Sequence, residues 1–241
     1  NIDGDTAMGS MLKFGSEGAK QFYDMFVLNP DHARAHREGD IHIHDLDFLT
    51  LTTTCCQIEL SSLFRDGFST GHGTLREPND IASYSALACI AIQSNQNDQH
   101  GGQSVPNFDY SMAPGVAKTY KKRYYRLLRN ALELLDNKLV DDDINDLKAA
   151  LQKEGLEPAL DDNPEYNERE KELLVEKGFD EKEVEKVQEF TRRKAADETD
   201  KATYQAMEAF IHNLNTMHSR AGAQTPFSSI NYGMDTSTEG R

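Results

Sequence analysis

The spacing of hydrophobic residues predicts two helices at the start of the chain. Apolar residues recur at helical spacing over 8–28, and the pattern stops at Asn29-Pro30 because proline disfavours continuation of a helix. A shorter helix is predicted over 31–38, with Asp31 as its N-cap and Gly39 as its C-cap residue.

Three further regions have a helical pattern. A helix over 81–96 is apolar on nearly all sides, so we expect it to be buried between layers with Cys89 in the core. Charged residues dominate over 119–202, which predicts an inserted helical segment. The helix predicted over 202–218 should pack one stripe on the core, formed by Tyr204, Met207, Ile211, Leu214 and His218.

The segment 40–48 alternates with a period of two. Ile41 and Ile43 alternate with His42 and His44, so an extended chain would place both imidazoles on one face and both isoleucines on the other. The pattern predicts a functional face opposite a packed one.

The β-branched run over 52–58 predicts a strand, as does the segment 227–232. The two-residue period of the run 52–58 places Cys55 and Gln57 on a polar face and Cys56 on the packing face. A thiol on a polar face beside two histidines has the access that thiol or thiyl chemistry requires. The alternative is that both cysteines are small core residues.

The segment 96–106 is almost free of apolar residues and is predicted to be a loop between a buried helix and a strand. Gly101 and Gly102 would let the backbone approach a ligand closely. An ordinary solvated loop has the same composition. The amides that could read sugar hydroxyls or a base edge are Gln96, Asn97, Gln99 and Gln103.

Composition restricts the partners. The formal net charge of −15 argues against nucleic acid or an anionic membrane, and the sequence has no apolar run long enough to cross a bilayer. Three cysteines, two of them adjacent, give no disulfide framework, so a reducing cytoplasm is expected. The basic run 118–126 either meets phosphates or forms a solvated helix face.

Several motifs, in their order, resemble the anaerobic (class III) ribonucleoside-triphosphate reductase family. They are Asp40-Ile-His-Ile-His-Asp-Leu-Asp, the cysteine strand, Gly101-Gly102, the helical run 205–218 and the run 220–233. The resemblance covers most of the chain and is weakest in the charged insertion. It implies an α/β fold in which 1–241 forms a single catalytic-barrel fragment. This fragment would be about the first half of a ten-stranded barrel of the glycyl-radical/ribonucleotide reductase type, with 119–202 inserted on the dimer and effector side.

The resemblance implies anaerobic reduction of ribonucleoside triphosphates to deoxyribonucleoside triphosphates by glycyl and thiyl radical chemistry, for DNA synthesis. Cys55 matches the catalytic strand cysteine that supplies hydrogen for loss of the 2′ hydroxyl. The matching substrate-binding positions, with formate as a further possible ligand of the histidines, are His42, His44, Gln57, Gly101 and Gly102. The matching effector and specificity-loop positions are Arg220, Gly222, Gln224 and Lys122.

The resemblance also implies partners and cofactors. These are deoxynucleoside triphosphate and ATP effectors, formate or a thioredoxin-like reductant, a second copy in a homodimer, and a radical-SAM activating enzyme. The glycyl radical, the finger-loop cysteine and a structural zinc site would lie in a C-terminal part beyond residue 241, and no metal site is expected within 1–241. We therefore expect this chain alone to be inactive, and expect a half-barrel to expose an edge strand and apolar surface.

Two alternatives belong to other functional classes. The chain could be a nucleotide-binding and dimerisation module without catalysis. It could also be a metal-dependent hydrolase that uses His42 and His44 as ligands, with His100 and Asp235 as the candidates for further ligands.

Overall fold

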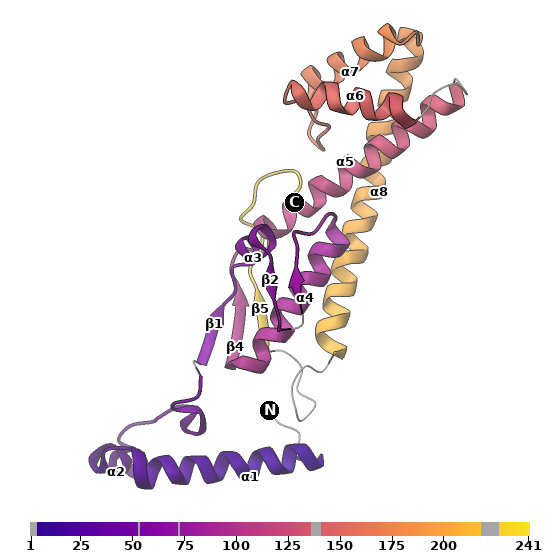
Figure 1. The fold of residues 1–241 in the computed structure, drawn as a ribbon. Helices are drawn as coiled ribbons and strands as arrows, with labels where there is room; N and C mark the ends of the chain where they lie inside the picture. Colours follow the sequence, from indigo (N-terminus) through magenta and orange to yellow (C-terminus); the bar gives the residue numbers. More distant parts are fainter. Residues whose placement is uncertain (1–3, 53, 72, 136–140, 218–226) are drawn as a thin grey trace.

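The computed structural model describes residues 4–52, 54–71, 73–135, 141–217 and 227–241 (Figure 1). The helices are α1 (Ala7–Phe22), α2 (Pro30–Glu38), α3 (Leu60–Asp66), α4 (Ile81–Asp98), α5 (Phe108–Leu135), α6 (Asp141–Lys153), α7 (Pro164–Glu176) and α8 (Glu181–Thr216). The strands are β1 (Thr54–Gln57), β2 (Phe68–Ser69), β3 (Thr74–Leu75), β4 (His100–Val105) and β5 (Ser228–Ile230). The described part is therefore α/β, with mostly helices and a small parallel sheet.

The sheet has β4 at its centre, in the order β1-β4-β5, and both pairings are parallel. The strands predicted over 52–58 and 227–232 are confirmed as β1 and β5. The prediction of a loop over 96–106 is wrong where β4 lies. The polar side chain of Gln103 in this strand finds a partner inside the protein: it is buried, and its Nε2 donates to the carbonyl oxygen of Ile92 at 2.9 Å.

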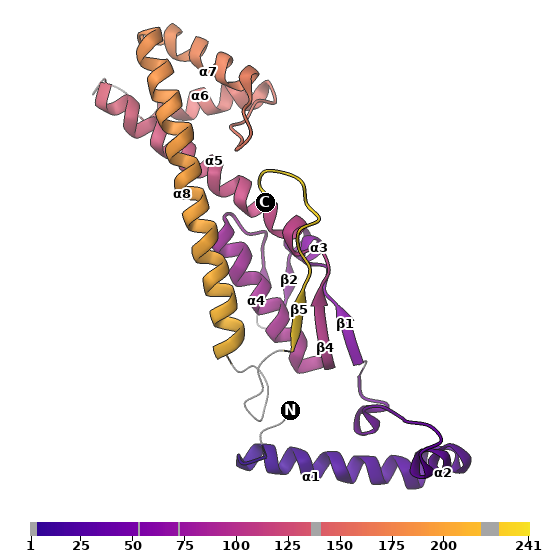
Figure 2. The ribbon, with the colours of Figure 1, turned by 180° about the vertical axis from the view of Figure 1, so that it is seen from behind.

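Helix α4 lies against the sheet and carries much of the first hydrophobic core (Figures 1 and 2). Asp80 caps it, since its side chain accepts from the backbone N–H of Ser83 at 3.0 Å. The predicted burial is confirmed, and Cys89 is 3 % exposed. The buried members of this core are Ile58, Leu60, Phe64, Ile81, Tyr84, Ala88, Cys89, Ala91, Ile92, Val105, Phe108, Met112, Val116, Ala206 and Phe210.

A second hydrophobic core lies at the end of the molecule that holds α6 and α7 (Figure 1). All of its buried members lie between Tyr120 and Ala195, whereas α5 and α8 each continue from this core into the first one. The limits expected for the helical insertion, 119 and 202, therefore fall inside continuous helices. Its status as a separate unit stays a prediction.

The stripe predicted to pack α8 on the core is wrong in part. Tyr204 is 71 % exposed and Ile211 is 52 % exposed, whereas Ala206 and Phe210 are buried. The small Ala206 allows a close approach to α4, where the Ser85 hydroxyl donates to the Ala206 carbonyl at 2.8 Å. The buried face is thus rotated toward Ala206 and Phe210, which were not in the predicted stripe, and His218 of that stripe lies outside the described residues.

The first predicted helix contains a change of helical type. It is α-helical over Ala7–Phe22 and π-helical over Tyr23–Val27, and it ends before Pro30 as expected. Asn29, rather than Asp31, caps α2, because its side chain accepts from the Asp31 N–H. The prediction for Gly39 is confirmed: it ends α2 with a left-handed φ of 86°.

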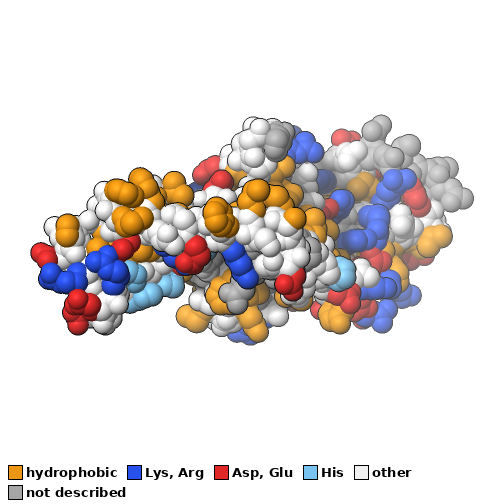
Figure 3. Space-filling model, turned by 90° about the horizontal axis from the view of Figure 1, so that it is seen from below, with side chains coloured by type: hydrophobic (Ala, Val, Ile, Leu, Met, Phe, Trp, Pro, Cys, Tyr) orange, Lys and Arg blue, Asp and Glu red, His pale blue; other side chains and the backbone are white. Residues whose placement is uncertain are grey.

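Helix α1 lies across one end of the molecule and leaves large apolar side chains exposed (Figures 1 and 3). The exposed members of α1 and the π-helical segment are Met8, Met11, Phe14, Phe22, Met25, Phe26 and Val27. The expected exposure of apolar surface is thus present in the described residues, whereas the partial barrel itself stays a prediction.

At the other end of the sheet, Asp109 ties the segment after β5 to the start of α5. The buried Oδ2 of this residue accepts the backbone N–H groups of Gly233, Met234 and Asp235, each at 2.8 Å. These bonds, above all the one from Asp235, lower the pKa of Asp109.

Candidate functional site

The Cys55 thiol lies at an irregular point of the sheet. Thr54 pairs with His100, but Cys56 pairs with Gln103, so two residues of β4 lie opposite the single residue Cys55. Cys55 itself has a left-handed φ of 55°, which is uncommon for a residue with a side chain. It is exposed, as the polar-face prediction required.

Gly101 of β4 lies against this thiol. A Cβ built on Gly101 would lie 3.1 Å from Cys55 Sγ and 3.2 Å from its backbone nitrogen, and the φ of Gly101 is +98°. A Cβ on Gly102 would lie 3.1 Å from the ring of Phe227. Both glycines thus permit close approach of neighbouring segments, Cys55 of β1 and Phe227 just before β5. Close approach of a ligand to them stays a prediction.

Cys56 faces the opposite way, in agreement with its predicted packing side. It is partly buried and packs against the first hydrophobic core. Asn95 Nδ2 donates to Cys56 Sγ at 3.0 Å and to Gln103 Oε1 at 2.7 Å. The third cysteine, Cys89, is a core residue, and burial raises the pKa of its thiol to about 11.

An open pocket of 490 Å³ lies on the exposed face of the sheet. It brings together three of the predicted site residues, Cys55, Gln57 and Gly102. Its remaining lining residues are Cys56, Gln103, Ser104, Phe227, Ser228 and Ser229. The lining combines the exposed ring of Phe227 with hydroxyl, amide and thiol groups, and these polar groups can bind a polar, hydroxyl-rich ligand.

Of the amide residues predicted to read a ligand, only Gln103 is among the residues that line this pocket. Gln96, Gln99 and Gln103 are each at most 5 % exposed. Gln99 Nε2 donates to the Gly101 carbonyl at 3.1 Å, so this amide supports the glycine pair from inside the protein.

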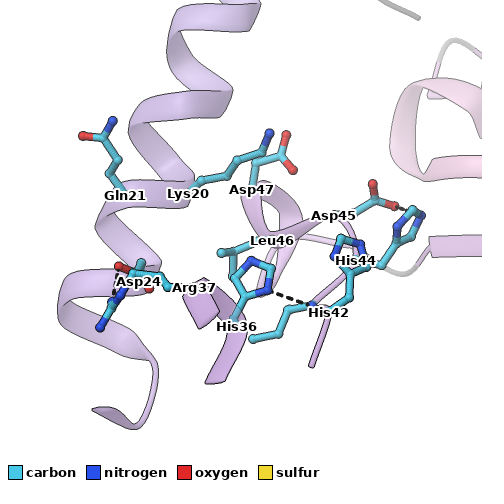
Figure 4. Close-up of a pocket in the computed structure, with 11 residues that line it drawn as sticks. Lys20, Gln21, Asp24, His36, Arg37, His42, His44, Asp45, Leu46 and Asp47 are labelled. Carbon is cyan, nitrogen blue, oxygen red and sulfur yellow. Dashed lines mark hydrogen bonds and ion pairs between the residues drawn. The ribbon is translucent and has the colours of Figure 1, made fainter. Parts of the chain in front are cut away.

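His42 and His44 line a different hollow, of 590 Å³, next to α1 and α2 (Figure 4). Both are exposed, and their ring centroids are 5.8 Å apart. The segment 40–48 is not an extended strand, because Asp45 takes a left-handed φ of 49° and begins a 3₁₀ turn over Leu46–Phe48. Ile41 is 44 % exposed, so the predicted packed face is wrong.

Two residues of this region, His36 and Asp45, were not assigned to the site from the sequence, and His100 was named only as a further ligand in the hydrolase alternative. His36 lies 5.7 Å from His42 between ring centroids, and its Nδ1 accepts the Ile43 N–H at 3.3 Å. Asp45 contacts both His44 and His100 at 3.2 Å. Only the position of Asp45 next to the His-x-His pair was a signal in the sequence, since the other contacts require the folded chain.

The predicted effector residues have mixed outcomes. Arg220, Gly222 and Gln224 lie outside the described residues. Lys122 forms an ion pair of 3.3 Å with Asp80, the residue that caps α4. Its neighbours in the basic run also face carboxylates, Lys121 facing Glu157 and Arg123 facing Glu198. A phosphate-binding role for this run stays a prediction.

Within the described ranges, no group of three or more His, Cys, Asp or Glu side chains is arranged to hold a metal ion. In the same ranges, no helix is both long enough and apolar enough to cross a membrane. The hydrolase alternative named Asp235 as a candidate ligand, and its Oδ1 accepts the Ser237 N–H at 2.8 Å in the segment held by Asp109.

Comparison with known proteins bears on the whole chain. The family described as anaerobic ribonucleoside-triphosphate reductase matches residues 1–241. Proteins of that name from Salmonella typhimurium and Escherichia coli K12 are 24 % and 25 % identical over 225 residues, which is 92 % of this chain and 24 % of each relative. The enzyme of that name from Enterobacteria phage T4 is 29 % identical over 106 residues, which is 43 % of this chain and 17 % of the phage protein.

The chain thus spans about a quarter of the length of the bacterial relatives that it matches. The family match, in contrast, extends from the first residue to the last and includes the cysteine strand, the paired glycines and the histidine segment. The chain belongs to the anaerobic ribonucleoside-triphosphate reductase family.

Proposed function

We propose that this chain is part of the catalytic barrel of an enzyme that reduces ribonucleoside triphosphates to deoxyribonucleoside triphosphates in the absence of oxygen. The observation that carries the proposal is the Cys55 thiol, displayed on the open face of a parallel sheet by a left-handed backbone and a glycine neighbour. Family membership over the full chain supports the same reaction.

The arrangement of the sheet supports the barrel part of the proposal. Three parallel strands have α4 on one face, and the other face is open and carries the pocket at Cys55. In a closed barrel the open face would line the interior. We propose that β1, β4 and β5 are strands of the first half of such a barrel.

In this proposal a glycyl radical, carried elsewhere in the enzyme, supplies the radical that starts the reaction. The Cys55 thiol would supply hydrogen as the 2′ hydroxyl of the substrate leaves as water, and formate or a thioredoxin-like protein would supply the reducing equivalents. Gln57 and the backbone at Gly102 line the same pocket and would bind the ribose. His42 and His44 would bind a phosphate or formate at the second hollow, since protonated or neutral imidazole can donate to an anionic oxygen.

The remaining expectations are also proposals. They concern nucleotide effectors, formate or a thioredoxin-like reductant, a homodimer, a radical-SAM activating enzyme and a cytoplasmic location. The chain alone, without a finger-loop cysteine or a glycyl radical, is expected to show no reductase activity. Activity of residues 1–241 alone that depended on Cys55 would contradict this expectation.

The proposal is tested by anaerobic reductase assays on the full-length protein. Cys55→Ser should lower turnover on the order of 10³-fold or more, as removal of a reacting group does in other enzymes. Cys89→Ala is the matched control, because this thiol is buried in the core and should be dispensable for turnover.

Cys56→Ser separates the two adjacent thiols. We expect it to retain most of the activity, because Cys56 packs inward and accepts a hydrogen bond from Asn95. Full activity of Cys55→Ser, together with loss of activity in Cys56→Ser, would assign the reacting thiol to Cys56 and contradict the proposal.

A further inference from the structure

Asp45 joins the histidine hollow to the central strand of the sheet. Its Oδ2 lies 3.2 Å from His44 Nε2, and its Oδ1 lies 3.2 Å from His100 Nε2. Figure 4 shows His44 and Asp45 pointing toward each other at one side of the hollow. The Asp45 side chain is 16 % exposed, His44 is 76 % exposed and His100 is 25 % exposed. The contact with His100 is thus the better shielded from solvent.

The turn that carries Asp45 holds His100 from a second side. The Phe48 N–H donates to the Asp45 carbonyl at 2.8 Å, which closes the 3₁₀ turn. The ring of Phe48 then stacks on the imidazole of His100, with centroids 4.1 Å apart and an interplanar angle of 17°. A carboxylate can only accept, so the His100 Nε2 carries the hydrogen of this contact. The turn therefore fixes both one ring nitrogen and one ring face of His100.

His100 is in turn adjacent to the groups that surround the thiol. It pairs with Thr54, the residue before Cys55. The next residue of β4 is Gly101, whose Cα lies so close to Cys55 that an added Cβ would be 3.1 Å from Sγ. A change in the position of His100 will therefore move the backbone that bounds the thiol.

We infer that Asp45 is a positioning residue that, through His100 and Gly101, holds the Cys55 thiol in its exposed geometry. The second oxygen of the same carboxylate connects this arrangement to the hollow that contains His44. The inference rests on the proposed function, in which Cys55 reacts with the substrate. Its consequence for the thiol can nevertheless be measured without turnover.

The test is the rate at which iodoacetamide alkylates each cysteine in the full-length protein, with tandem mass spectrometry to separate Cys55 from Cys56. Asp45→Ala should raise the rate at Cys55 by about fivefold, because Gly101 no longer has a fixed position against the thiol. Asp45→Asn keeps one oxygen that can accept from His100 Nε2, so it should restore most of the original rate.

A double-mutant cycle with His100→Ala distinguishes a positioning role from a general structural one. If Asp45 acts through His100, Asp45→Ala should add little to the rate of the His100→Ala variant. The control is Asp40→Ala, which removes an exposed carboxylate from the same segment but outside the lining of the hollow. Cys89 reports the integrity of the fold, since a variant that unfolds would also alkylate this buried thiol faster.

Multiplication of the two single effects in the double variant would overturn the inference, as would an equal acceleration by Asp40→Ala. If Asp45→Ala also accelerates alkylation of Cys89, this variant has loosened the fold, and Asp45→Asn is compared with wild type instead. A fivefold rise in the alkylation rate of Cys55 in Asp45→Asn would then overturn the inference. Failure of the proposed function appears separately, as reductase activity that survives Cys55→Ser. The two failures are thus distinguishable.

Discussion

The conformation of single residues decides which thiol the sheet displays. Alternation along the strand correctly separated Cys55 from Cys56, because one side of β1 faces the core. The sequence did not predict the left-handed φ of Cys55 or the irregular register opposite it, since both depend on how β4 pairs with β1. The paired glycines indicated a close approach from the sequence alone, but that Cys55 and Phe227 are the groups that approach them is known only from the folded chain.

We predict that Gly101→Ala disturbs the thiol as well as the fold. The variant must accommodate a Cβ 3.1 Å from Cys55 Sγ at a φ of +98°. Gly178→Ala is a matched control, because its φ is +101° and no atom lies within 4 Å of the added Cβ. Backbone strain should cost each variant about 1–2 kcal/mol of unfolding free energy, measured in urea. Only Gly101→Ala should change the alkylation rate of Cys55, and equal rates in the two variants would contradict the close contact.

The histidines show a similar division between sequence and structure. The pattern around His42 and His44 correctly indicated exposed imidazoles, but it predicted an extended chain where Asp45 begins a 3₁₀ turn. His36 and His100 come from α2 and β4, so no local pattern could place them beside this segment.

At the scale of elements, predictions succeeded where the hydrophobic pattern was strong and failed where buried groups are polar or small. Helix α4 is apolar on most sides, and its burial was predicted. Strand β4 was predicted to be a loop because the segment has almost no apolar residues. Its polar Gln103 can nevertheless be buried, since it finds its hydrogen-bond partners on α4. The buried face of α8 was misplaced because it is built on Ala206 as well as Phe210, and alanine carries little hydrophobic signal.

A buried carboxylate connects three of the helices of the second core, α5, α7 and α8. Glu170 of α7 is fully buried and accepts from Tyr124 of α5 at 2.8 Å, from Tyr166 at 2.6 Å and from Gln188 of α8 at 2.8 Å. Burial raises the pKa of Glu170, and the three hydrogen bonds oppose this shift.

We predict that Glu170→Leu costs about 3 kcal/mol of unfolding free energy, because the two tyrosine hydroxyls and the Gln188 amide lose a buried acceptor. Glu170→Gln keeps an acceptor of similar shape and should cost much less. The comparison is made by urea unfolding at neutral pH. Equal losses in the two variants would show that packing, and not the hydrogen bonds, sets the contribution.

The same residue gives a pH dependence with a definite sign. Because the folded pKa of Glu170 lies above its ordinary value of 4.5, the folded state binds this proton more tightly than the unfolded state. Its contribution to stability is largest below pH 4.5 and decreases as the pH rises through the folded pKa. The unfolding free energy of wild type minus that of Glu170→Gln should therefore fall as the pH rises above 4.5, and a constant difference would refute the raised pKa.

At the scale of the whole molecule, two hydrophobic cores share two long helices. The first core supports the sheet and the thiol, and the second lies between residues 120 and 195. The second core lies within the charged stretch 119–202, but the sequence could not show that α5 and α8 pass through the limits of this stretch unbroken. Leu160 packs against both cores, so they are in contact as well as continuous.

If the helical region of 119–202 is a separate unit, a cavity in one core should loosen that core alone. Leu151 and Leu60 are both fully buried, Leu151 in the second core and Leu60 in the first, so Leu151→Ala and Leu60→Ala are matched cavities worth about 3 kcal/mol each. Native-state hydrogen exchange should show faster exchange in α6 and α7 for Leu151→Ala, with the amides of β4 unchanged, and the reverse for Leu60→Ala. Because α5 and α8 belong to both cores, each of these helices should have faster amide exchange in the half that packs on the altered core and unchanged exchange in the other half. Equal acceleration of exchange in both regions by either variant would mean that the continuous helices join the two cores into one cooperative unit. In that case the charged insertion could not be removed without loss of the sheet that displays Cys55.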